Sequence, residues 1–101
     1  NILRPGVDGW AFVGRRANGD WTAAYLDFDE QNPEPNRDYT VQYYVTVLDT
    51  PGENASRLGR LVKGQKVLVK EFRGYNLPAS ESNQFTKDGD YYANVTVLSG
   101  E

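Results

Sequence analysis

Hydrophobic and polar side chains alternate with a period of two along most of the chain. The clearest run is YTVQYYVTVL, residues 39–48, and residues 66–72 and 91–98 follow the same pattern. Successive side chains of a β-strand point to opposite faces of a sheet, so this spacing predicts strands. β-branched and aromatic residues, which strands favour, dominate the three runs. Because no stretch carries a helical stripe of apolar residues, we predict an all-β fold.

The alternation also assigns side chains to the two faces of the predicted sheet. If Val45 and Val47 point into the core, Tyr43 should do so too, and Tyr44 should point outward. By the same rule, the other residues predicted to point inward are Val41, Val67, Val69, Tyr91, Ala93, Val95 and Val97.

A second apolar set is predicted on the outside of the sheet. It consists of Tyr44, Leu48, Leu68, Phe72, Tyr92 and Leu98. A monomer rarely leaves an apolar patch of this kind in contact with water. Two explanations are open. The N-terminal segment covers the patch with Trp10, Phe12 and Phe28, or the patch is a groove for a partner.

Turn-forming residues separate the runs. Asn18-Gly19 and Asp88-Gly89 supply the positive φ angles of tight turns, and residues 62–66 predict a short glycine-centred hairpin. Residues 29–38 contain two prolines and two asparagines without periodicity, which predicts an exposed linker. Short strands joined by glycine turns suggest a small barrel.

A longer pattern links these elements. A Tyr-Val-Thr strand, a Pro-Gly turn, a Leu-Gly-Arg-Leu strand and a Lys-Gly-Gln-Lys-Val hairpin follow one another within residues 43–72. Residues 9–26 carry a Gly-Trp opening, an Asn-Gly turn, a second tryptophan and an Ala-Tyr-Leu close, and residues 74–98 repeat this phrase loosely. In this order and spacing, the elements resemble those of bacterial SH3-like (SH3b) domains.

The resemblance implies a single all-β domain, residues 1–101, with three parts. Residues 39–98 are expected to form a small, partly open SH3-like barrel, residues 29–38 the linker, and residues 1–28 an extra N-terminal β-hairpin or the tail of a second unit. A length of 101 residues is typical of one domain. An OB-type barrel and a small β-sandwich are the alternative folds.

Composition narrows the chemistry. The chain contains no histidine and no cysteine, so it lacks the commonest general base and every thiol function. We predict a module that is not an enzyme and takes no cofactor or metal. The net charge of −3 argues against a nucleic-acid partner. The absence of a long apolar run argues against a membrane span. A set of basic residues is interpreted as a solvated strand face: Arg57, Arg60, Lys63, Lys66 and Lys70, together with Arg15 and Arg16.

Exposed tyrosines beside loops are the candidate ligand contacts, because tyrosine combines a flat apolar ring with a polar hydroxyl. We expect loops 50–57 and 75–85 to flank a groove. Its predicted residues are a platform of Tyr44, Tyr75 and Tyr92, with Asp49, Glu53 or Glu81 pairing with a cationic ligand group.

The resemblance implies that this groove binds peptide or peptidoglycan, within a larger or exported bacterial protein that works outside the cytoplasm or in the cell envelope. Two alternatives stay open. One is an assembly domain that docks on a protein partner through its outward apolar face. The other is an OB-type binder of oligosaccharide or single-stranded nucleic acid.

Overall fold

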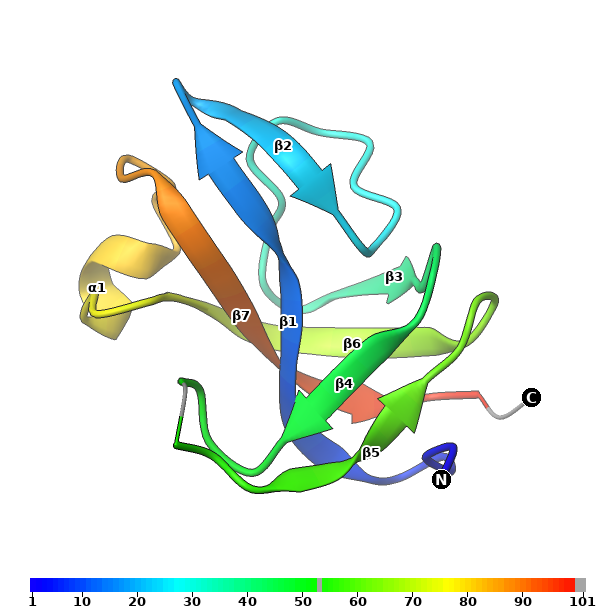
Figure 1. Ribbon diagram of the computed structural model, residues 1–101. Helices are drawn as coiled ribbons and strands as arrows, with labels where there is room; N and C mark the ends of the chain where they lie inside the picture. The colour runs from blue at the N-terminus through cyan, green and yellow to red at the C-terminus, as the bar shows by residue number, and fades with distance from the viewer. Residues whose placement is uncertain (53, 100–101) are drawn as a thin grey trace.

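The computed structural model describes residues 1–52 and 54–99 and contains one antiparallel sheet of seven strands (Figure 1). The strands are β1 (Asp8–Ala17), β2 (Asp20–Ala24), β3 (Arg37–Thr40), β4 (Val45–Leu48), β5 (Arg57–Leu61), β6 (Lys66–Gly74) and β7 (Gly89–Val97), and a short helix, α1 (Ala79–Ser82), lies between the last two. They are ordered β3-β6-β7-β1-β4-β5, with β2 paired to β1. Since this path ends at β3 and β5, the sheet is open. The all-β prediction is confirmed.

Strand β1 joins the two halves of the sheet. Along one side it pairs with β7 over most of its length. Along the other side its C-terminal half pairs with β2 and its N-terminal half pairs with β4 (Figure 1). The predicted N-terminal hairpin is therefore present as β1 and β2, but β1 is an inner strand that separates β7 from β4. Residues 39–98 do not form the sheet without it.

The β1–β2 hairpin depends on two glycines. At the predicted turn, Asn18 and Gly19 have φ angles of 54° and 81°, and the Asp88 carboxylate accepts both backbone N–H groups at 2.8 and 3.2 Å. Gly14, where β1 meets the end of β2, has a φ of 156°, and a Cβ there would lie 2.3 Å from the Ala23 carbonyl oxygen. Only glycine allows the two backbones to approach this closely.

The run 39–48 is two strands rather than one. β3 pairs with β6, whereas β4 pairs with β1 and β5, so the chain must cross from one part of the sheet to another between them. The break at Gln42–Tyr44 is held by the Gln42 N–H, which donates to the Tyr25 carbonyl oxygen at 2.9 Å. Because the alternation stops at the break, the prediction that Tyr43 points inward is wrong: its side chain is 60% exposed.

Within the strands, alternation holds where the ladder is regular. The residues predicted to be inward and found buried are Val41, Val45, Val47, Val67, Val69, Tyr91, Ala93, Val95 and Val97. Phe72 is the exception, since it was expected outside and is fully buried. The register of β6 against β7 shifts between Val69 and Glu71, and the extra residue turns the following side chains to the opposite face.

Of the two explanations for the outer apolar set, a covering N-terminal layer is not present in the described part of the chain. Trp10 and Phe12 lie on β1 within the sheet itself, opposite Asn94 and Tyr92 of β7, rather than on top of them. Phe28 packs against Phe72, with ring centroids 5.9 Å apart.

The linker predicted at residues 29–38 ends earlier than expected, because Arg37 and Asp38 already belong to β3. It is also tied down: the Arg16 guanidinium donates to the Gln31 carbonyl oxygen at 2.7 Å, and the Tyr39 hydroxyl donates to Glu30 at 2.5 Å.

Two predicted turns have other roles. Residues 62–66 connect β5 to β6, which are not neighbours in the sheet, so they form a corner and not a hairpin. Asp88-Gly89 leads from the α1 segment into β7.

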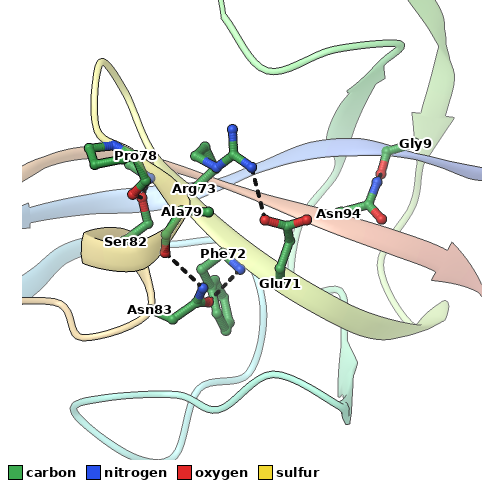
Figure 2. Close-up of polar contacts among 10 residues, drawn as sticks. Gly9, Glu71, Phe72, Arg73, Pro78, Ala79, Ser82, Asn83 and Asn94 are labelled. Atoms are coloured by element: carbon green, nitrogen blue, oxygen red, sulfur yellow. Dashed lines mark hydrogen bonds and ion pairs between the residues drawn. The ribbon is translucent and has the colours of Figure 1, made fainter.

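Helix α1 protects the part of β6 that β3 does not reach (Figure 2). The Asn83 side-chain oxygen accepts the Phe72 N–H at 2.7 Å, and the buried Ser82 hydroxyl accepts the Gly74 N–H at 2.9 Å. These side chains replace the missing strand, so the edge of β6 keeps its hydrogen bonds.

Candidate functional site

One hollow lies where the partner of β1 changes from β4 to β2, and we call it the fork pocket. Its volume is about 380 Å³. It is lined by Phe12, Tyr25, Tyr43, Tyr44, Val45 and Thr46. Phe12 comes from β1, Tyr25 directly follows β2, and Thr46 is on β4. The pocket is thus a consequence of the sheet topology, since the two strands that share one side of β1 diverge there.

Aromatic rings continue the fork pocket across the outer face of the sheet. Phe12 contacts Tyr92 of β7 with ring centroids 5.5 Å apart, and it contacts Tyr25 at 5.4 Å. Tyr25 in turn contacts Tyr43 at 6.2 Å. All three contacts are edge-to-face, an arrangement that aromatic pairs favour. We call the four rings, with Tyr44, the aromatic line.

A second hollow of about 370 Å³ shares Tyr43 with the fork pocket, and we call it the polar pocket. It is lined by Asp27, Thr40, Val41, Gln42, Tyr43, Lys63 and Gly64. Its walls are fixed, because Asp27 accepts the Thr40 N–H at 2.6 Å and the Gln42 amide donates to the Leu26 carbonyl oxygen at 3.0 Å.

A third, smaller hollow of about 170 Å³ lies at the other end of the aromatic line, and we call it the loop pocket. It is lined by Pro51, Arg73, Gly74, Tyr75, Asn76, Leu77 and Tyr92. Glu71 forms an ion pair with Arg73 at 3.0 Å (Figure 2). The Arg73 guanidinium also lies 5.4 Å from the centre of the Trp10 ring. The three pockets therefore follow one another along the aromatic line.

The predicted platform is divided between two pockets. Tyr75 and Tyr92 line the loop pocket together with Pro51 of the predicted flanking loop, whereas Tyr44 lines the fork pocket. Phe12, which contacts Tyr92 and lines the fork pocket, connects them.

The three predicted acidic contacts are placed differently. Asp49 accepts the Ser56 N–H at 2.9 Å and so braces the β4–β5 loop. Glu81 is exposed on α1 and lines none of the three pockets. Glu53 lies outside the described residues.

Sequence reasoning missed Phe12, Tyr25 and Tyr43 as pocket residues. For Phe12 a signal existed, because alternation with buried Ala11 and Val13 puts it on the outer face. For Tyr25 and Tyr43 there was none, since both lie just outside strands.

The surface tyrosines differ in chemistry from the buried ones. Tyr43 and Tyr44 are 60% and 65% exposed, and their hydroxyls form no hydrogen bond within residues 1–52 and 54–99. Tyr39 and Tyr91 are buried and hydrogen-bonded, and burial, which penalises the tyrosinate, raises the pKa of each above its ordinary value of 10.0. The exposed pair is available to a ligand without breaking contacts of the fold.

Among the described residues there is no cluster of three or more side chains suited to a metal ion, and none of their helices is long and apolar enough to cross a membrane. Comparison of the chain with protein families, curated proteins and solved structures finds no match. The SH3-like resemblance therefore stays a prediction.

Proposed function

We propose that the chain is a non-catalytic binding module that holds an extended ligand, a peptide or a cell-wall glycopeptide, along the aromatic line. One observation carries the proposal. Tyr43 and Tyr44 stand 60% and 65% exposed around the fork pocket, and large apolar groups gathered at one exposed place mark interaction sites. Exposed tyrosines with few internal contacts are typical of surfaces that bind partners, because they offer contact area at little cost in rotamer entropy.

The arrangement of the pockets supports an extended ligand rather than a compact one. Three hollows follow one another from the loop pocket through the fork pocket to the polar pocket, and each shares a ring or a ring contact with the next. Peptides bound in grooves place successive side chains in such separate hollows. The chain would then act as the ligand-holding part of a larger or exported protein.

The proposal is tested by retention of purified peptidoglycan and by selection from a displayed library of random linear peptides. The native chain is expected to retain at least one of these, and the Tyr43→Ala/Tyr44→Ala variant to lose it. Leu58→Ala is the matched control, since Leu58 is also an exposed apolar residue but lines none of the three pockets.

Retention of neither ligand, or equal retention by native chain and double variant, contradicts the proposal. Dimerisation that depends on Trp10 or Leu48 would instead favour an assembly domain, because both lie on the outer face of adjoining strands.

A further inference from the structure

The cations of this acidic chain are not distributed evenly. Four of them form ion pairs with carboxylates: Arg15, Arg37, Lys70 and Arg73. In contrast, residues 55–70 contain five basic residues and no acidic one. Of these five, only Lys70 forms an ion pair within the part of the chain that the structure describes.

Three of the remaining cations border the pockets, and we call Arg60, Lys63 and Lys66 the basic rim. Lys63 lines the polar pocket. Arg60 is the register partner of Thr46, which lines the fork pocket, and Lys66 is the register partner of Thr40, which lines the polar pocket. Residues directly opposite in an antiparallel pair project on the same face of the sheet. All three side chains are exposed.

The only carboxylate lining these two pockets in the described part of the chain is Asp27, and its Oδ1 already accepts the Thr40 N–H. The basic rim is thus a local excess of positive charge in a chain whose net charge is −3. Unpaired like charges side by side repel one another, and an anionic ligand removes that repulsion.

Backbone groups at the fork indicate what kind of anionic ligand fits. The peptide groups of Tyr43 and Tyr44 form no backbone hydrogen bond with any described residue. They lie beside β1 at the point where it has left β4 and pairs with β2. An extended peptide satisfies free N–H and C=O groups of this kind with its own main chain, which an oligosaccharide or a nucleic acid does not do in the same regular way.

We propose that the ligand of the groove is an extended peptide with acidic side chains, which runs from the fork pocket to the polar pocket and places its carboxylates against the basic rim. This inference rests on the proposed binding function and names the chemistry of its ligand. Apolar or aromatic side chains of the peptide occupy the fork pocket, and the carboxylates follow where the groove reaches Lys63.

The test starts from the peptides selected by the native chain from the random displayed library. They are expected to be enriched in Asp and Glu next to an apolar or aromatic position. A synthetic peptide of the selected sequence should bind about tenfold more weakly to Arg60→Glu/Lys63→Glu, because exposed ion pairs account for a few-fold each and reversal adds repulsion. Its affinity for the native chain should also fall as salt is raised.

Lys87→Glu is the matched control. Lys87 is exposed, forms no ion pair among the described residues and lines none of the three pockets. Its substitution by Glu therefore makes the same charge reversal as each rim substitution, but away from the groove. Its affinity for the peptide should stay within about twofold of native, since distant surface charges are screened.

The outcomes separate this inference from the proposed function. Selected peptides that need Tyr44 but contain no excess of acidic residues, or that bind the reversed rim equally well, overturn the inference and leave the binding function standing. Retention of peptidoglycan without any peptide selected does the same. Competition by a thymidine oligonucleotide at the same rim also overturns it. If the Tyr43→Ala/Tyr44→Ala variant still retains both the selected peptide and peptidoglycan, the binding function itself is overturned.

Discussion

The chain contains two groups of aromatic side chains that are close in sequence but differ in place: one packs in the interior and the other lies on the outer face. The interior cluster consists of Trp21, Phe28, Tyr39, Phe72, Phe85 and Tyr91, which pack ring against ring inside the sheet. The aromatic line runs over the outside. Tyr91 and Tyr92 are consecutive residues of β7, yet one is fully buried and the other faces the loop pocket.

The difference shows which aromatic residues the fold requires. The hydroxyls of Tyr39 and Tyr91 donate to Glu30 and to the Lys87 carbonyl oxygen, so their rings and their polar ends both have structural partners. Tyr43 and Tyr44 are held by few contacts and are mostly in water. We infer that the interior cluster determines stability and that the aromatic line determines binding.

The largest effect on stability is expected from Tyr91→Ala. Its ring is fully buried between Trp21 and Phe85, so its removal leaves a cavity and deprives both rings of a packing partner. We expect a loss of about 3 to 5 kcal/mol in the free energy of unfolding, measured by urea denaturation. A loss of less than about 1 kcal/mol would mean that the interior cluster is not the core of the fold.

The next effect is expected at Gly14, where β1 meets the end of β2. Gly14→Ala should lower the free energy of unfolding by about 2 to 3 kcal/mol, because its Cβ would meet the Ala23 carbonyl oxygen at 2.3 Å and its φ is positive. Gly6→Ala is the control: its φ is also positive, at 93°, but nothing lies within 4 Å. It should lose only about 1 kcal/mol. Equal losses in the two variants would show that the positive φ alone, and not the close approach to the Ala23 carbonyl oxygen, determines the loss of stability.

Alternation predicted the strands and most of the core, because burial on one face repeats every second residue as long as pairing is regular. It failed at Phe72 and at Tyr43 for two separate reasons. At Phe72 the ladder gains one residue, and at Tyr43 the chain leaves one strand pair for another. Both events depend on long-range pairing, which no local pattern records.

The candidate site shows the same limit. Tyr44, Tyr75 and Tyr92 were recognisable as outward tyrosines. The fork pocket was not, because it exists only where β2 and β4 separate along β1. Residues 39–98 alone do not form the fork pocket, since one of its walls comes from Phe12 on β1.

A smaller effect is expected at the edge of the interior cluster. Asn83→Ala removes the acceptor of the Phe72 N–H and leaves this donor without its partner. The free energy of unfolding should fall by about 1 to 2 kcal/mol, and amide exchange at Phe72 should accelerate. Gln84→Ala, which removes an exposed contact to the Ser80 carbonyl oxygen, should change stability by less than about 0.5 kcal/mol. Unchanged exchange at Phe72 would contradict the role given to α1.

Alkaline pH separates the two regions without mutation. The pKa values of Tyr39 and Tyr91 are raised above 10.0 in the fold by burial, so the folded chain holds these protons more tightly than the unfolded chain does. Their stabilisation is complete below pH 10 and is lost as pH rises through the folded pKa values. Urea denaturation across this range should show the decline. Tyr44→Phe should keep it, whereas Tyr39→Phe/Tyr91→Phe should flatten it; the same slope in both variants would rule out this origin.

The most direct measurement is the pair of values obtained for one variant, Tyr43→Ala/Tyr44→Ala. Its free energy of unfolding should stay within about 0.5 kcal/mol of native, because both residues are mostly exposed, while its retention of the selected peptide or of peptidoglycan should be lost. A variant that is clearly destabilised, or one that keeps its ligand, would contradict the division between an interior that folds and a surface that binds.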